Sequence, residues 1–176
     1  VIILVINCGS SSIKYQLLDM KSDEVYDLLA KGIVEKIGLE TGRLQYTVIG
    51  KDKVVKDLPV PDHKVGMKLV LEALTDSEHG VLKSLDDIEA VGHRIVHGGE
   101  FFSSSALVNE DVMKKIEICC DFAPQSCPHS WYQSGSACAS FCTSGGYVRY
   151  SIPSVYSVLC LYVRIAIRLL FQVSRT

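Results

Sequence analysis

The sequence predicts a mixed α/β fold, because strand-like and helix-like patterns of apolar residues follow one another along the chain. Residues 2–6 form a wholly apolar run rich in β-branched side chains, and residues 13–18 resume strand character after a turn-forming cluster. Residues 65–74 instead carry their apolar side chains at helical spacing. The length of 176 residues is enough for one or two domains.

The first two apolar runs are joined by residues 7–12, which contain one glycine and three serines. Such a cluster between two strand-like runs predicts a β-hairpin with a polar tip. Residues 44–49, with the sequence LQYTVI, are a further strand candidate. We therefore expect strands before the helix over residues 65–74.

Beyond that helix, two short apolar stretches at residues 88–91 and 95–96 flank Gly92, His93 and Arg94. A last helix is expected after Asn109, which is a suitable N-cap residue. That helix would place its apolar side chains, Val112, Ile116 and Cys120, on one face.

The composition changes abruptly near Pro124. All 20 acidic residues lie in the first 121 positions, and residues 125–176 contain four arginines but no Asp, Glu or Lys. Six of the seven cysteines fall at or after position 119. We therefore divide the chain into residues 1–124 and a compositionally different tail, residues 125–176.

Charge and hydropathy exclude several classes of function. A formal net charge of -2 without a basic stripe argues against a nucleic-acid-binding protein. The apolar run at the N-terminus has no basic segment before it and no small-residue cleavage site, so we interpret it as a buried strand rather than a signal peptide. We expect a cytoplasmic protein.

The hairpin segment at residues 7–14 is the first candidate site. A tip with Gly and three Ser brings backbone N–H groups and hydroxyls together, as a polyphosphate requires, and Lys14 adds a positive charge. The side-chain oxygen of Asn7 is suited to a hydrated Mg²⁺. Taken alone, the segment fits a polar turn with an exposed lysine better, because short Gly/Ser motifs often arise by chance.

The second candidate is the segment at residues 91–100, with the sequence VGHRIVHGGE. The guanidinium of Arg94 suits a small carboxylate, and the neighbouring glycines allow close approach to a ligand. His93 and His97 do not share a helical face in such a strand-like stretch, so structural roles are the better interpretation for both.

Two segments of the sequence resemble motifs of acetate kinases. VINCGSSSIKYQLLDM resembles their opening phosphate motif, and AVGHRIVHGGEFF resembles their substrate-arginine motif. The resemblance runs from about Ile2 to Pro124. It implies the RNase H-like fold of the actin, sugar-kinase and heat-shock-ATPase group. It also implies transfer of the ATP γ-phosphoryl group to acetate, giving acetyl phosphate and ADP, with Mg²⁺ as cofactor.

The resemblance assigns roles to individual residues. Asn7 would be associated with Mg²⁺, while Ser10, Ser12 and Lys14 would lie in the phosphate-binding hairpin. Arg94 would hold the acetate carboxylate or the transferring phosphoryl group. Family members form homodimers through a C-terminal half that these residues do not include.

The sequence departs from the family pattern after Pro124, where a Leu-His-Asn-Pro word is expected and Gln125 to Pro128 stand instead. The later catalytic Asp, His, Arg and Glu of the family are also missing. We expect no catalytic residue to be retained and the chain to be inactive. The alternatives are a non-catalytic fragment that still binds nucleotide and a relative acting on propionate or butyrate.

The tail is explained by a shift of the reading frame. Read one base later, codon degeneracy allows residues 125–128 to become Asn-Pro-Ala-His and residues 149–154 to become Asp-Thr-Ala-Phe-His-Gln, in the order expected of an acetate kinase. We therefore expect an out-of-frame, poorly folded tail.

Two other features of the tail have simpler explanations than function. Cys127, His129, Cys138 and Cys142 have no common zinc-site spacing. Residues 155–173 are apolar enough to suggest a membrane span, and a membrane-associated protein is the third hypothesis. Their two arginines would each cost roughly 2.5–3.5 kcal/mol at the bilayer centre, which disfavours a true span.

Overall fold

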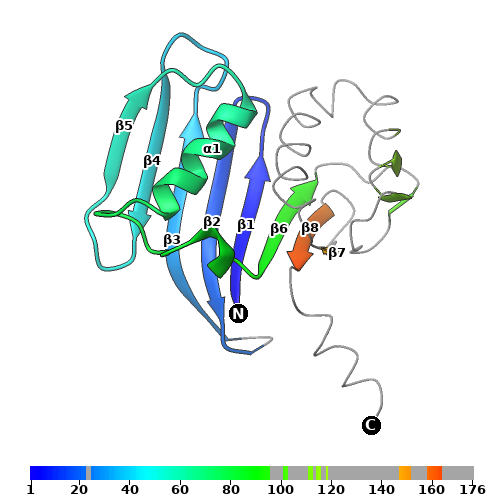
Figure 1. Cartoon of the computed structure of the whole chain (residues 1–176). Helices are drawn as coiled ribbons and strands as arrows, with labels where there is room; N and C mark the ends of the chain where they lie inside the picture. The colour runs from blue at the N-terminus through cyan, green and yellow to red at the C-terminus, as the bar shows by residue number, and fades with distance from the viewer. Residues whose placement is uncertain are drawn as a thin grey trace.

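A computed structural model of the chain describes residues 1–22, 25–95, 101, 102, 111, 112, 114, 115, 118, 147–151 and 158–163. Within these residues, eight strands form one sheet in the order β5-β4-β3-β2-β1-β6-β8-β7 (Figure 1). The strands are β1 (Ile2–Cys8), β2 (Ser12–Met20), β3 (Tyr26–Glu35), β4 (Gly42–Val48), β5 (Val54–Leu58), β6 (Ala90–Ile95), β7 (Tyr147–Ser151) and β8 (Val158–Val163). Neighbouring strands are antiparallel, except that β1 and β6 run parallel.

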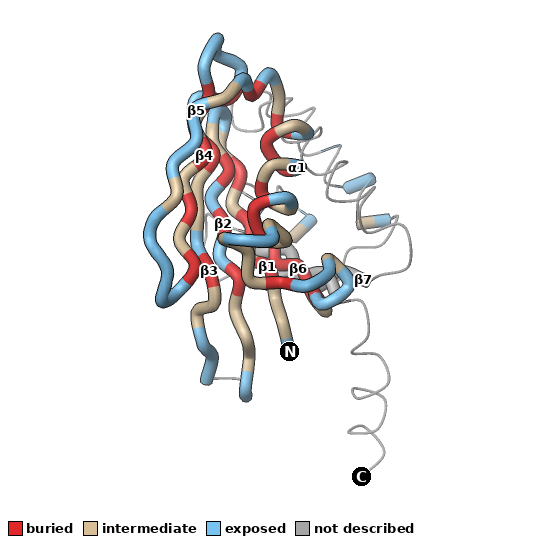
Figure 2. Tube along the Cα trace, turned by 60° about the vertical axis from the view of Figure 1, so that its left-hand side comes forward, coloured by how far each residue is buried: buried red, intermediate tan, exposed pale blue. Residues whose placement is uncertain are grey.

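Strand β2 shows how the sequence assigns each face of the sheet. Its side chains alternate strictly at Ile13, Lys14, Tyr15, Gln16 and Leu17, the odd-numbered ones buried and the even-numbered ones exposed. Since alternate side chains of a strand point to opposite faces, the odd positions form the core face. The buried positions of the strands lie on the side of the sheet that carries the helix (Figure 2).

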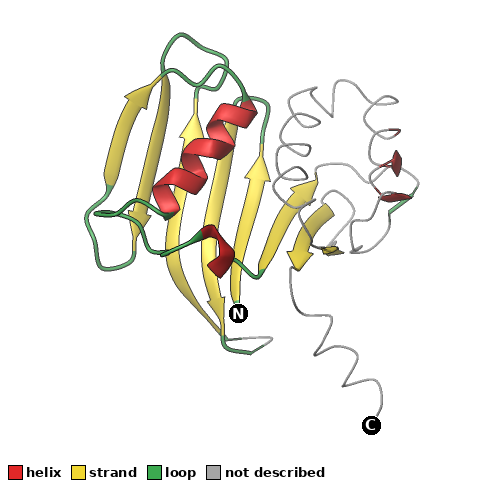
Figure 3. Cartoon of the chain, viewed as in Figure 1, coloured by secondary structure: helices red, strands yellow, loops and turns green. Residues whose placement is uncertain are grey.

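Helix α1 (His63–Leu74) lies across this core face (Figure 3). The side chain of Asp62 caps its N-terminus by accepting a 2.8 Å hydrogen bond from the Val65 N–H. The helix buries one stripe at a spacing of three and four residues, comprising His63, Gly66, Met67, Val70, Ala73 and Leu74. A short 3₁₀ helix, η1 (Leu85–Asp87), then leads into β6.

The structure confirms the predicted hairpin, the strand near residues 44–49 and the helix over residues 65–74. The two stretches around Gly92, His93 and Arg94 belong to one strand, β6. Strands β3 and β5 were not predicted. β3 carries glycine and several polar residues, and β5 is a short edge strand that is exposed or half-buried, so neither has the apolar pattern on which the prediction depended.

The helix expected after Asn109 is described only in part. Residues 111, 112, 114, 115 and 118 are helical. Asn109, Ile116 and Cys120 lie outside the described residues, so the proposed cap and the full apolar face stay predictions.

Candidate functional site

The turn between β1 and β2 consists of Gly9, Ser10 and Ser11. It is closed by a 2.7 Å hydrogen bond from the Gly9 N–H to the Ser12 carbonyl oxygen. Ser10 and Ser11 are exposed, while Ser12 is half-buried at the start of β2. The tip therefore presents two hydroxyl-bearing side chains and their backbone to solvent.

Two contacts from later in the chain hold this tip against the domain. The Ile37 N–H donates a 3.0 Å hydrogen bond to the Ser11 carbonyl oxygen. The ring nitrogen Nε2 of His63 lies 2.8 Å from the Gly9 carbonyl oxygen. The carbonyl groups of Gly9 and Ser11 are therefore bonded to protein, and neither is left to compete with the N–H groups for a ligand.

Asn7, Lys14 and Arg94 occupy one row across three adjacent strands. Asn7 is paired with Lys14 in the antiparallel β1–β2 ladder. On its other side Asn7 is paired with Arg94 in the parallel β1–β6 ladder. Of Arg94 the structure describes the backbone alone, and it lies two strands from Lys14. The two sequence motifs, separated by 80 residues in the chain, therefore meet on the two sides of β1.

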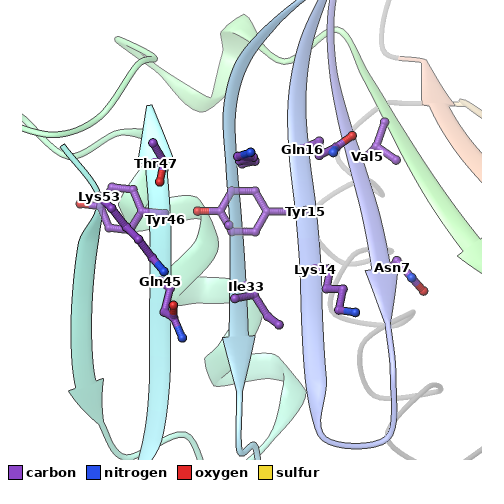
Figure 4. Close-up of a pocket in the computed structure, with 12 residues that line it drawn as sticks. Val5, Asn7, Lys14, Tyr15, Gln16, Ile33, Gln45, Tyr46, Thr47 and Lys53 are labelled. Carbon is purple, nitrogen blue, oxygen red and sulfur yellow. The ribbon is translucent and has the colours of Figure 1, made fainter. Parts of the chain in front are cut away.

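A hollow of about 540 Å³ lies on the sheet face opposite α1 (Figure 4). Most of its lining side chains come from alternate positions of the strands, which places them on the face that the helix does not cover. The row between them, Tyr15, Gly32 and Tyr46, belongs to the core face and borders the hollow from below. The residues lining it are Val5, Asn7, Lys14, Tyr15, Gln16, Lys31, Gly32, Ile33, Gln45, Tyr46, Thr47 and Lys53. Asn7 and Lys14 thus lie at one end of a wider polar depression.

The hollow is positively charged. Lys14, Lys31 and Lys53 line it, and no carboxylate is among its lining residues. Within the described part of the chain, none of these three lysines forms an ion pair. Among the lining residues, Gln45 donates a 2.9 Å hydrogen bond from its side chain to the carboxylate of Glu35. An unneutralised cluster of cations is suited to an anionic ligand.

The floor of the hollow is thin at Gly32. Tyr15, Gly32 and Tyr46 share one register row, and the Tyr15 ring extends over Gly32 toward Tyr46 on the core face (Figure 4). A Cβ atom at Gly32 would lie 2.6 Å from three atoms of that ring. Burial raises the pKa of Tyr15, and the neighbouring Tyr46 raises it further. Burial also raises the pKa of Tyr46, with Asp76 and Glu78 adding to the effect.

The predicted site residues fall into three groups. Asn7, Ser10, Ser12 and Lys14 lie together on the β1–β2 hairpin, and Arg94 joins their row through its backbone. His93 is buried, at 4% exposure, as its structural interpretation required. The remaining predicted site features, His97 and the Cys and His residues of the tail, lie outside the described residues.

Sequence reasoning missed the far end of the hollow and the support behind the hairpin. Lys31 and Lys53 come from a strand and a strand end that are not apolar enough to be recognised, whereas Gln45 lies in a predicted strand but was not assigned to a site. His63 bonds to Gly9 across 54 positions of sequence. A helix-starting histidine carries no local signal for such a long-range contact.

Two further observations restrict the site. Across the residues that the structure describes, no group of three or more His, Cys, Asp or Glu side chains is arranged to hold a metal ion. No helix in the described ranges combines the length and the hydropathy that crossing a bilayer requires. Of the suggested span at residues 155–173, the structure describes residues 158–163, which form β8.

The antiparallel strands β1, β2 and β3, followed by a helix and by β6 parallel to β1, have the topology of the actin-like, sugar-kinase fold group. The family model described as the Acetokinase family matches residues 2–137. The chain belongs to that family. The matched range continues past Pro124, where the composition changes.

Similar proteins support the same assignment. The chain is 53% identical over 122 residues to the acetate kinase of Clostridium botulinum strain Alaska E43, a match that covers 69% of this chain and 30% of that protein. It superposes on the crystal structure of Porphyromonas gingivalis acetate kinase with a TM-score of 0.70 at 42% identity, covering 77% of this chain and 33% of that one.

A propionate kinase is also similar. The crystal structure of the enzyme from Francisella tularensis matches with a TM-score of 0.65 at 32% identity, over 80% of this chain and 34% of that one. The chain thus spans about a third of the length of these relatives.

Proposed function

We propose that this chain is the N-terminal portion of an acetate kinase, which transfers the γ-phosphoryl group of ATP reversibly to acetate. The observation that carries the proposal is the register row formed by Lys14, Asn7 and Arg94. It brings a lysine beside a serine-rich tip and an arginine-bearing strand to the same end of β1. Polyphosphate and a small carboxylate would meet there.

The hairpin would bind the phosphate groups of the nucleotide. Ser10 and Ser12 would donate hydrogen bonds to phosphate oxygens, and Lys14 would neutralise part of their charge. Phosphoryl transfer depends mainly on positioning and on charge neutralisation, so these contacts would contribute directly to the rate. The exposure of Ser10 and Lys14 leaves both side chains accessible to a ligand.

Asn7 fits a role beside Mg²⁺ because its side chain offers a neutral oxygen ligand of the kind that this ion accepts. Mg²⁺ in kinases keeps several waters and is bound largely by substrate phosphates, so a complete protein cage is not required. When bound, the ion would neutralise charge on the phosphate oxygens. The position of the half-buried Asn7 opposite Lys14 supports that role.

Arg94 would bind the carboxylate of acetate, or the phosphoryl group in transfer, through its planar guanidinium. The pairing of Arg94 with Asn7 supports this role, because β6 lies next to β1 and brings Arg94 to the strand beside the hairpin. Acyl-chain preference stays open. The similarity to a propionate kinase structure makes a propionate- or butyrate-specific relative the second candidate.

We further propose that the 176 residues do not turn over substrate by themselves. They span about 30% of the length of a similar acetate kinase, and the family's later Asp, His, Arg and Glu are not among them. The chain would then be a fragment with residual nucleotide binding. A cytoplasmic location and a homodimer formed through the C-terminal half would be properties of the whole enzyme.

Two assays on the purified chain test the proposal. Calorimetry should detect saturable binding of ATP that Lys14→Ala weakens at least tenfold, whereas Lys68→Ala, which removes an exposed charge from α1, should leave it unchanged. A hydroxamate assay for acetyl phosphate should detect no turnover. Equal loss of binding in both lysine variants contradicts the hairpin site. Turnover at about one-thousandth of a full-length acetate kinase, abolished by Arg94→Ala, contradicts the inactivity.

A further inference from the structure

His63 is a buried polar residue that the proposed chemistry does not use. It is the first residue of α1, its exposure is 3%, and its Nε2 atom lies 2.8 Å from the Gly9 carbonyl oxygen. A carbonyl oxygen only accepts hydrogen bonds, so Nε2 must carry the proton and donate it. The contact joins the start of the helix to the tip of the hairpin.

This hydrogen bond fixes the direction of a peptide group. The peptide between Gly9 and Ser10 is planar and trans, as are all peptide bonds in the described residues. In a trans peptide the C=O and the following N–H point in opposite directions. Since the Gly9 carbonyl points toward His63 on the core side, the Ser10 N–H points away from α1.

The tip needs such a restraint because of Gly9. Glycine has access to both halves of φ/ψ space, so a peptide next to it can flip at little cost. A flip would turn the Ser10 N–H toward the helix and present a carbonyl oxygen to the ligand, which would repel an anion. The bond from the Ile37 N–H holds the Ser11 carbonyl, two peptide groups further on. Among the described contacts, it leaves the Gly9–Ser10 peptide to His63 alone.

We propose that His63 is a positioning residue for the hairpin, which holds the Ser10 N–H in the direction from which an anionic phosphate group approaches. The identity of the ligand rests on the proposed function. The orientation of the Gly9–Ser10 peptide does not rest on it, because the bond to His63 is present in the chain without any ligand. His63 itself would touch no substrate.

NMR on the full 176-residue chain, labelled with ¹⁵N and ¹³C, tests the orientation without any ligand. We expect long-range ¹⁵N spectra to show a proton on Nε2 of His63. His63→Phe should shift the Gly9 carbonyl ¹³C and Ser10 amide resonances or split them into two conformers. His63→Gln, whose amide nitrogen can donate from a similar place, should restore them. Unchanged Gly9 and Ser10 resonances in His63→Phe would overturn the proposal.

Titration with inorganic tripolyphosphate tests the consequence. If the Ser10 N–H of His63→Phe no longer faces the ligand, its hydrogen bond to the charged phosphate is lost, and the affinity of this variant for tripolyphosphate should fall about tenfold. The affinity of His63→Gln should stay within about threefold of the wild type. Val70→Ala, a destabilising change in the middle of α1 away from Gly9, is the matched control and should bind as the wild type does.

The outcomes separate the two proposals. A wild-type chain that shows the His63-dependent resonances but binds no tripolyphosphate would contradict the proposed phosphate site and leave the positioning role supported. Equal losses of affinity in His63→Phe and Val70→Ala would mean that general destabilisation causes the effect, and would overturn the positioning role. Failure of His63→Gln to restore both readouts would overturn it as well.

Discussion

Lys14 lies directly opposite Asn7 in the β1–β2 ladder, and both line the same hollow on the uncovered face of the sheet. Lys31 and Lys53 extend that hollow across β3 to the start of β5. The positive charge is therefore not confined to the hairpin tip. An extended anion bound at the hairpin would experience the field of all three lysines.

We predict that Lys31→Ala weakens the binding of tripolyphosphate about two- to fivefold, as the loss of an exposed cation at the edge of a site should. Lys14→Ala should have a larger effect because it removes the cation next to the serine tip. Calorimetry at low and high salt measures both. The Lys31 effect should disappear at about 1 M salt, where exposed charges are screened within a few ångströms. An effect of Lys31→Ala that is independent of salt would contradict a purely electrostatic role.

The packing of Tyr15 over Gly32 leads to a prediction about stability. A methyl group at Gly32 would lie 2.6 Å from the Tyr15 ring, which is too close for the ring to stay in place. Gly32→Ala should therefore destabilise the fold by about 1–3 kcal/mol in urea denaturation, despite the better strand propensity of alanine.

A double-mutant cycle isolates this contact. Tyr15→Leu shortens the side chain, so Gly32→Ala should cost clearly less in that background than in the wild type. Equal costs in the two backgrounds would show that the Tyr15 ring is not the source of the destabilisation.

How far the sequence predicted the structure depended on whether local pattern or long-range pairing determined each feature. The strand character of residues 13–18 and the helical spacing of residues 65–74 are local, and both were predicted correctly. The register row of Asn7 and Arg94 brings together distant residues. Only the resemblance of two sequence motifs to one family suggested that Asn7 and Arg94 belong to a single site.

The parts that were missed share a physical cause. β5 has exposed or half-buried side chains throughout, so no apolar alternation marks it. In β3, Gly32 interrupts the core-facing positions because the neighbouring Tyr15 ring fills its space. Lys31 and Lys53 could not be assigned to a site until strand pairing placed them around the same hollow as Lys14. In β3, the Tyr15 ring of the partner strand fills the space that a core side chain at position 32 would otherwise fill. The sequence of β3 therefore lacks the apolar residue by which a strand is recognised.

Tyr15 also predicts a dependence of stability on alkaline pH. Burial raises the pKa of Tyr15 above its ordinary value near 10, so the folded chain holds the phenol proton more tightly than the unfolded chain. A raised folded-state pKa contributes stability in full below about pH 10, the pKa of an unfolded tyrosine, and loses it as the pH rises further. The fold should therefore weaken progressively above about pH 10.

Tyr15→Phe removes this titration and keeps the ring. The hydroxyl has no hydrogen-bond partner in the described part of the chain, so its removal should cost at most about 1 kcal/mol at neutral pH. Thermal melts between about pH 9 and about pH 11 should fall less steeply for Tyr15→Phe than for the wild type. Tyr26→Phe, at a tyrosine that is 56% exposed, is the control and should melt like the wild type. Identical slopes for all three proteins would contradict the assignment to Tyr15.

The tail after Pro124 leads to a prediction about the coding DNA. We propose that residues 125–176 are translated one base out of register, because the absence of acidic residues coincides with the loss of the family's Leu-His-Asn-Pro word. Trp131 and Tyr132 are informative, since tryptophan has a single codon and tyrosine codons begin with T. The shifted frame must then encode glycine, and isoleucine can follow it.

Nucleotide sequencing across codons 120–176 decides the question. The shifted frame should encode Asn-Pro-Ala-His at residues 125–128 and Asp-Thr-Ala-Phe-His-Gln at residues 149–154. The codon for the family's aspartate should overlap the codon for Arg149. Restoring the frame, together with the Leu-His pair that we expect to have been lost at the junction, should then introduce an aspartate into residues 125–176, which contain no acidic residue. If no frame beyond Pro124 encodes these words, the tail is a genuine part of the protein and needs its own structural explanation.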